Sequence, residues 1–282
     1  LNYEIKNSFI KAKIKSFGAE LNSLQKIEND FEYIWQADKQ YWARHSPVLF
    51  PIVGRLKDDS YIYKSKKYNL SQHGFARDKE FELVKKDEDF IEFSLKNDEE
   101  TLEIYPFLFE LNISYKLEKT KLIISYKVKN RSEDRLYFSI GAHPAFNISS
   151  GDFLDFEDVR TSKRYFLNDK GLIYKNQEVS FTKNSLILDE EIFKNDALVF
   201  NDKNIKSIIL RDKNSNKILK VEFKDFPYLG IWSKPNLAPF VCIEPWFGVA
   251  DEENSNQNIE DKRGVQVLLK DELFSCFYSI EI

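Results

Sequence analysis

Strict alternation of apolar and polar residues is the feature that most limits how this chain can fold. From Phe109 to Leu117 every second residue is apolar and the residues between are polar or charged, and the pattern continues from Leu122 to Val128. A period of two turns successive side chains to opposite faces, as in a half-buried β-strand. Lys119 and Thr120 lie between the two runs, so we expect two antiparallel strands joined by a short turn.

The same strand signal recurs along the chain, and it predicts an all-β fold. It appears in segments 10–15, 81–84, 90–93, 136–140, 207–210, 218–223 and 274–282. Helical periodicity is scarce, and only segment 185–195 predicts a short helix. Short strands with turn signals roughly every ten residues favour a large antiparallel β-sandwich. Because we find no linker and no internal repeat, we expect one domain over residues 1–282.

Segment 46–55 departs from this pattern because it carries two prolines, Pro47 and Pro51, in an apolar run that ends at Arg55. Proline has no N–H group to donate to a neighbouring strand, so it is disfavoured in the middle of a sheet. We therefore predict a buried, irregular loop whose role is geometric.

Composition excludes several classes of partner. The net charge of the 282 residues is −4, with both signs spread along the chain, which argues against nucleic acid or an anionic membrane surface. No apolar run reaches the ~18 residues that a membrane-spanning helix requires, and no secretory segment opens the sequence, so we expect a soluble cytoplasmic protein. Cys242 and Cys276 are far apart, which predicts neither a disulfide framework nor a thiolate metal cluster.

Three short motifs each place one titratable residue among glycines, prolines and aromatic residues: His73 in segment 72–78, His143 in segment 141–146 and Glu244 in segment 242–248. Glu244 lies between Ile243 and Pro245, where burial would raise the pKa of its carboxyl group toward that of a general base. Each histidine by itself is equally well explained as a structural hydrogen-bonding residue.

Further side chains in or near these motifs have two interpretations. Arg55 and Arg77 could form surface salt bridges, or present planar donors to sugar hydroxyls or a phosphate. Trp232 and Trp246 could be core residues, or could stack on the apolar face of a pyranose ring.

Other chemistries are less well supported. Two histidines and a glutamate match a common zinc set, but His73, His143 and Glu244 are far apart in sequence, and we predict no metal. The chain has neither a Gly-x-Ser-x-Gly elbow nor a glycine-rich phosphate loop.

Five motifs in order resemble those of aldose 1-epimerase-like proteins, and the resemblance is closest to the LacX-type branch. They are Phe50-Pro51-x-x-Gly54-Arg55, His73-Gly74-Phe75-Ala76-Arg77, Tyr105-Pro106-Phe107, His143-Pro144-Ala145-Phe146 and Glu244-Pro245-Trp246-x-Gly248-x-Ala250-Asp251. The resemblance implies a galactose mutarotase-like supersandwich with an open cleft for a sugar, and no cofactor. Two copies of the chain could also assemble as a homodimer.

The resemblance also implies roles for individual residues. Glu244 would be the general base and His143 the general acid, and His73 would assist at the ring oxygen. The remaining predicted residues would contact the sugar: Arg55, Gln72, Arg77, Asp196, Trp232 and Trp246.

Three functions remain open at this stage. The first is an aldose 1-epimerase acting on a hexose or a close derivative, the second is a hexose-6-phosphate epimerase, and the third is a carbohydrate-binding protein without catalysis. The His-Gly-Phe-Ala-Arg and Glu-Pro-Trp motifs differ from those of the better-known galactose mutarotases, so the resemblance does not identify the sugar.

Overall fold

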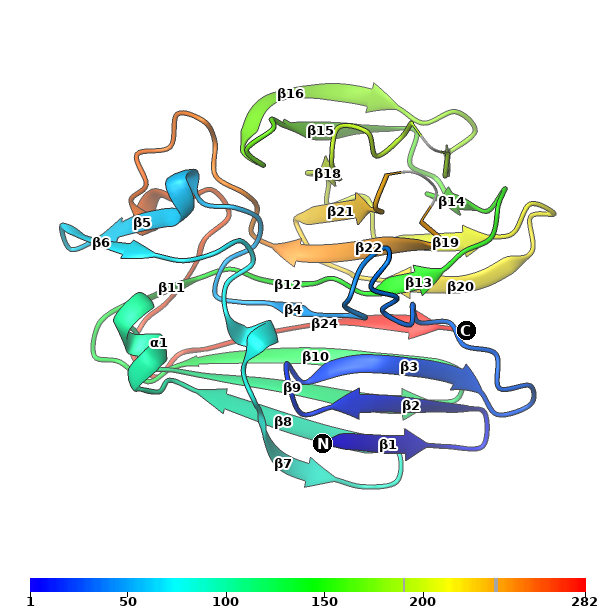
Figure 1. Cartoon of the computed structure of the whole chain (residues 1–282), viewed down its shortest axis with the longest axis horizontal. Coiled ribbons are helices and arrows are strands. Elements are labelled where there is room, and N and C mark those ends of the chain that lie inside the picture. The colour runs from blue at the N-terminus through cyan, green and yellow to red at the C-terminus, as the bar shows by residue number, and fades with distance from the viewer. Residues whose placement is uncertain (190, 236–237) are drawn as a thin grey trace.

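The computed structural model describes residues 1–189, 191–235 and 238–282, and confirms the predicted all-β architecture (Figure 1). Two large antiparallel sheets form the sandwich. The nine-stranded sheet has the order β17 (Ser185–Ile187), β14 (Phe153–Asp155), β19 (Ser207–Arg211), β20 (Lys217–Glu222), β24 (Leu273–Glu281), β10 (Lys121–Asn130), β9 (Phe109–Glu118), β8 (Phe90–Lys96) and β7 (Glu82–Lys86).

The second large sheet carries the segments that later form the site. Its order is β16 (Ile173–Ser180), β15 (Thr161–Leu167), β18 (Leu198–Phe200), β21 (Tyr228–Trp232), β22 (Phe240–Phe247), β12 (Ile140–Ala142) and β4 (Val48–Leu49), and β13 (Ala145–Asn147) also pairs with β22. Strand β22 runs through the middle of this sheet (Figure 1).

Smaller elements complete the fold. A three-stranded sheet of β1 (Asn2–Lys6), β2 (Ile10–Lys15) and β3 (Glu20–Lys26) packs on the nine-stranded sheet, where the ring of Tyr3 on β1 meets the edge of Phe93 on β8. Two further pairs are β5 (Ser60–Tyr63) with β6 (Lys66–Asn69), and β11 (Leu136–Phe138) with β23 (Gln266–Leu268). Three 3-10 turns are η1 (Lys57–Asp59), η2 (Ala76–Asp78) and η3 (Ile259–Asp261).

The helix prediction for segment 185–195 is wrong. Residues Ser185–Ile187 form strand β17, which pairs with β14, and turns follow in the described residues after it. The carboxylate of Asp189 accepts hydrogen bonds from the backbone N–H groups of Glu191 and Ile192. Because β14 supplies backbone partners for residues 185–187, tertiary pairing overrides the local pattern in that part of the segment.

The α-helix that the structure does contain, α1 (Glu99–Ile104), was not predicted. It is short and begins with a capping box in which Asp98 and Thr101 exchange hydrogen bonds. Six residues are too few for helical periodicity to be visible in the sequence. No helix in the described ranges has the length and apolar character needed to span a membrane.

Most strand predictions are confirmed, and the two prolines act as expected. Residues 46–53 are buried, and segment 46–55 contributes only the two-residue edge strand β4, followed by a cis peptide bond between Phe50 and Pro51. The predicted strand 136–140 is divided between β11 and β12, because the backbone N–H of Ser139 donates to the carbonyl of Pro51.

Strand β22 separates the core from the site. Val241 and Ile243 belong to the main apolar cluster between the sheets, together with Ile113 of β9 and Ile124 of β10. Because successive side chains of a strand point to opposite faces, the alternate residues of β22 face away from that core. Those residues are Cys242, Glu244 and Trp246.

Candidate active site

A cavity of about 310 Å³ lies on this outer side of the eight-stranded sheet. Residues from many regions that are distant in sequence line it. All nine predicted site residues are among them: Arg55, Gln72, His73, Arg77, His143, Asp196, Trp232, Glu244 and Trp246. The fold therefore brings the motifs together, while the role of each residue stays a prediction.

Glu244 and Trp246 are positioned by β22 and by glycines on the neighbouring strands. Gly230 of β21 lies opposite Glu244, and Gly141 of β12 lies opposite Trp246. A Cβ atom on Gly230 would lie 2.4 Å from the Trp246 ring, and one on Gly141 would lie 2.5 Å from it. The two glycines leave the space that the indole fills, and the indole N–H donates to the carbonyl of Ala142 at 3.2 Å.

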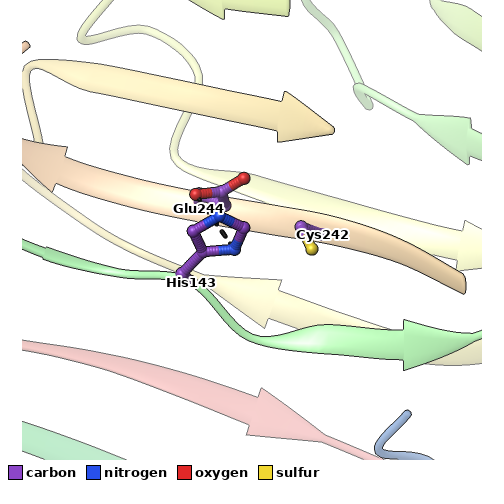
Figure 2. A group of neighbouring side chains, drawn as sticks. All are labelled: His143, Cys242 and Glu244. Atoms are coloured by element: carbon purple, nitrogen blue, oxygen red, sulfur yellow. Dashed lines mark ion pairs between the residues drawn. The ribbon is translucent and has the colours of Figure 1, made fainter. Parts of the chain in front are cut away.

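His143 directly follows β12, the strand that pairs with β22, and its side chain meets that of Glu244. Figure 2 shows the imidazole and the carboxyl group side by side, with His143 Nδ1 at 3.3 Å from Glu244 Oε2. Neither atom has a well-aligned hydrogen-bond partner in the described residues, and both side chains are more than nine-tenths buried. Two polar atoms so placed are available to a ligand.

His73 belongs to a loop that is held tightly by its backbone. Its φ angle is 68°, its N–H donates to the carbonyl of Gly54, and its Nδ1 accepts from the N–H of Gly54 at 3.2 Å. Since Nδ1 is an acceptor, the neutral ring carries its hydrogen on Nε2 and can donate there. Gly74 follows with φ of 69°, where a Cβ atom would lie 2.3 Å from the carbonyl oxygen of Phe50.

The two arginines reach the cavity from neighbouring loops. Arg77 donates to the carbonyl of Gln72 at 2.7 Å, and its neighbour Asp78 forms an ion pair with Arg44 at 2.9 Å. Arg55 Nε lies 3.3 Å from the carboxylate of Asp59, an ion pair without an aligned hydrogen bond. Burial, and then the charge of Arg44, lowers the pKa of Arg77 to about 10, so its guanidinium remains charged at neutral pH.

Burial pushes His143 and Glu244 toward their neutral forms. The pKa of Glu244 is raised well above its usual range by burial and then by the carboxylate of Asp196. Burial, followed by the charge of Arg77, lowers the pKa of His143 to about 3. The pKa of His73 is also lowered, chiefly by burial. Both shifts favour a protonated Glu244 beside a neutral His143.

Trp42 is a site residue that the sequence analysis missed. Its ring stacks on the imidazole of His143, with centroids 4.8 Å apart and planes at 27°, and meets Trp232 edge-on. It lies in the loop before β4, outside every motif used above. A tryptophan in such a loop is indistinguishable from a core residue in the sequence, so no signal pointed to it.

One group of potential metal ligands occurs in the part of the chain that the structure describes. His143, Cys242 and Glu244 each offer one ligand atom, and these atoms lie within 4.8 Å of one another (Figure 2). The group contains Cys242 in place of His73, so it differs from the set considered from the sequence.

The fold and the site together define a β-sandwich with a buried histidine–glutamate pair in a polar and aromatic cavity. The chain belongs to the aldose 1-epimerase family, whose model matches residues 2–264.

Two known relatives are the plasmid and chromosomal LacX proteins of Lactococcus lactis subsp. lactis. Each is 33% identical over 300 residues, covering 100% of this chain and 99% of the relative. This confirms the resemblance to the LacX-type branch.

Solved structures of similar proteins agree with the fold. A galactose mutarotase related enzyme from Lactobacillus acidophilus has 36% identity and a TM-score of 0.94, covering 100% of this chain and 97% of that protein. A galactose mutarotase-like protein from Lactobacillus casei has 29% identity and a TM-score of 0.93, covering 99% of both chains.

Proposed function

We propose that this chain is a cofactor-independent aldose 1-epimerase that interconverts the α and β anomers of a hexose or a hexose derivative. The observation that carries the proposal is the 3.3 Å separation of His143 and Glu244 inside a cavity large enough for a sugar ring. Family membership supports the general reaction, and the cavity lining supports a polyhydroxylated ring as its substrate.

The reaction needs two simultaneous proton transfers and no external oxidant or reductant. Glu244 takes the proton of the C1 hydroxyl while His143 gives a proton to the ring oxygen, and the C1–ring oxygen bond breaks. The open-chain aldehyde then rotates about its C1–C2 bond, and closure on the other face reverses both transfers. Each well-placed acid or base typically contributes about 10²–10⁴-fold to the rate.

The unusual pKa values favour both transfers once the pair is charged. A carboxylate whose pKa is raised is a stronger base, and an imidazolium whose pKa is lowered is a stronger acid. The short Nδ1–Oε2 separation places a proton on the Glu244 carboxyl group within reach of His143. His73, with its hydrogen on Nε2, would assist at the ring oxygen.

The remaining residues would hold the sugar. Arg55, Gln72, Arg77 and Asp196 offer donors and acceptors to its hydroxyl groups. Trp42, Trp232 and Trp246 offer aromatic faces that suit its C–H surfaces.

A second candidate, a hexose-6-phosphate 1-epimerase, is favoured by one observation. An outer hollow of about 520 Å³ adjoins the cavity and shares Arg55, Gln72 and Arg77 with it. Two guanidinium groups at this junction could bind a phosphate on the exocyclic carbon while the ring lies against Glu244.

The test is NMR exchange or polarimetry with freshly dissolved α-glucose, α-galactose and their 6-phosphates. We expect faster anomer interconversion with at least one of them. A marked preference for the 6-phosphates that is lost in Arg77→Ala would favour the second candidate. Binding of sugars without acceleration of any would overturn both enzymatic functions and leave a carbohydrate-binding protein.

A further inference from the structure

Cys242 lies beside His143 and Glu244, and the proposed reaction gives it no role. It lies on β22, two residues before Glu244 and on the same face of the strand, and it is fully buried. On its other side it contacts an apolar cluster that includes Trp35, Ala145 and Phe240. Figure 2 shows its sulfur beside the imidazole and carboxyl groups.

The spacing of the three side chains is close to that of a zinc coordination shell. Zinc lies about 2.0–2.3 Å from nitrogen, oxygen and sulfur ligands, which places tetrahedral ligand atoms roughly 3.3–3.7 Å apart. His143 Nδ1 and Glu244 Oε2 already have this separation, at 3.3 Å. No two of the three ligand atoms are more than 4.8 Å apart. A shift of roughly 1 Å would therefore bring all three to the spacing of a zinc shell, and a side-chain rotation is enough to produce it.

Two features show that the site can receive a cation. His143 Nδ1 and Glu244 Oε2 are buried and lack aligned partners in the described residues, so a bound ion would satisfy both atoms. The charges also balance. Binding releases the thiol proton of Cys242 and the proton held by Glu244 to solvent, so two anionic ligands and one neutral imidazole neutralise a divalent ion.

The types of ligand select the class of ion. A set of one imidazole, one thiolate and one carboxylate suits zinc and similar borderline ions. Calcium and magnesium prefer sets of oxygen ligands, which the thiolate cannot supply. With three ligands from the protein, a fourth position is left for water or a hydroxyl group on the cavity side.

We propose that His143, Cys242 and Glu244 form a binding site for a zinc-type divalent cation, and that the bound cation inhibits the enzyme. Inhibition follows because the ion would occupy both the acid and the base, so cation and sugar would compete for the same groups. The inhibitory half of this proposal rests on the proposed function, whereas cation binding itself does not.

Cobalt(II) titration of the metal-free chain tests binding without any need for activity. We expect one Co²⁺ per chain, with the visible bands of tetrahedral cobalt and a thiolate-to-cobalt charge-transfer band. In Cys242→Ser the charge-transfer band should disappear and the affinity should fall at least about tenfold, since even outer residues of metal sites contribute that much.

Cys276→Ser is the matched control, because Cys276 is the other free cysteine and lies on β24 in the nine-stranded sheet. Its titration should match that of the wild type. Absence of a charge-transfer band in the wild type, or an unchanged band in Cys242→Ser, would overturn the proposal.

The inhibitory half is tested with Zn²⁺ on any sugar that the enzyme accepts. Zn²⁺ should slow interconversion, EDTA should restore it, and sugar should raise the Zn²⁺ concentration needed. Each variant is compared with its own rate in EDTA, and Cys242→Ser should need at least about tenfold more Zn²⁺. Equal sensitivity to Zn²⁺ in Cys242→Ser would refute inhibition through this site.

The two proposals fail in different ways. An inactive chain that binds Co²⁺ would contradict only the proposed function, whereas an active chain without a thiolate-to-cobalt band would contradict only the cation site.

Discussion

At the scale of single residues, Glu244 links the proposed reaction to stability. It is 1% exposed, and its raised pKa means that the folded protein resists ionisation of this carboxyl group. A glutamate of the unfolded chain ionises near its ordinary pKa of about 4.3. The native state is therefore destabilised as the pH rises above that value, until the pH reaches the raised pKa of Glu244.

Glu244→Gln should lower kcat by at least about 10²-fold, because glutamine is not a base. The variant should also be more stable than the wild type at neutral pH, by about 1 kcal/mol or more, since its amide stays uncharged when buried. Urea denaturation at pH 7 and pH 4 measures the effect, and the gain should shrink at pH 4. Glu103→Gln, at an exposed position on α1, is the control and should show no such pH-dependent gain. Full activity in Glu244→Gln would rule out Glu244 as the base.

The pH dependence of the reaction follows from the same pair of residues. As the pH falls, His143 and Glu244 gain a second proton only near the lowered His143 pKa of about 3, and Glu244 then cannot act as a base. As the pH rises, they lose their shared proton only through the raised Glu244 pKa, and no acid then remains. We expect kcat/KM, corrected for spontaneous interconversion, to fall on the acid side only near pH 3. A step near pH 6.5, where an ordinary histidine titrates, would contradict this assignment.

At the scale of elements, the site depends on how closely neighbouring strands and loops pack. Strand β21 approaches β22 closely because Gly230 has no side chain, and the Trp246 ring occupies that space. The loop after β22 is joined to the Arg55 loop through Asp251. The N–H of Asp251 donates to the carbonyl of Arg55, and its carboxylate accepts from the N–H of Lys57 and from Lys262.

Gly230→Ala should destabilise the protein by about 1–3 kcal/mol, the usual cost of overpacking. The added methyl group would displace the Trp246 ring, so the KM for sugar should rise as well. Chemical denaturation and steady-state kinetics measure the two effects. The double variant Gly230→Ala/Trp246→Phe should regain part of the lost stability, because the smaller ring removes the clash. Failure to regain any would show that the ring is not the obstacle.

Lys262→Met should destabilise the protein by about 3–5 kcal/mol, because it leaves the buried carboxylate of Asp251 without its cation. The two side chains are 3% and 4% exposed and 2.8 Å apart. The adjacent pair of Arg263 and Glu252 is a matched control, since its side chains are 43% and 35% exposed. Arg263→Ala should cost less than about 1 kcal/mol. Similar losses for the two variants in thermal or urea denaturation would contradict this account of the buried pair.

At the scale of the whole molecule, β24 joins the two halves of the nine-stranded sheet. It pairs with β10 along most of its length and with β20 near its end, and it contributes Tyr278 and Ile280 to the core. Strand β1, in contrast, pairs only with β2 at the edge of the small sheet.

A chain that stops at Glu272 should therefore lose cooperative thermal unfolding, because β10 and β20 would both lose their partner and expose apolar surface. A chain that lacks Leu1 to Lys6 is the control and should still unfold cooperatively, at a lower temperature. Circular dichroism melting curves distinguish the two. A cooperative transition in the chain without β24 would show that the sheet does not depend on this strand.

The sequence by itself determined the fold class and most of the polar residues of the site. Period-two alternation is a local consequence of strand geometry, so β9, β10 and β24 could be predicted residue by residue. The five motifs contain six of the nine predicted residues that line the cavity, since polar groups beside glycine and proline are visible without coordinates. The helix prediction at 185–195 was wrong because residues 185–187 pair with β14, a distant partner that local periodicity does not detect.

Only the tertiary structure decided distances and environments. The 3.3 Å contact between His143 and Glu244 depends on the pairing of β12 with β22, which joins segments about a hundred residues apart in the sequence. The stacking of Trp42 on His143 and the place of Cys242 beside the pair likewise arise from packing between distant segments. Burial then sets the direction in which each pKa shifts, because desolvation depends on everything packed around a group and not on its neighbours along the chain.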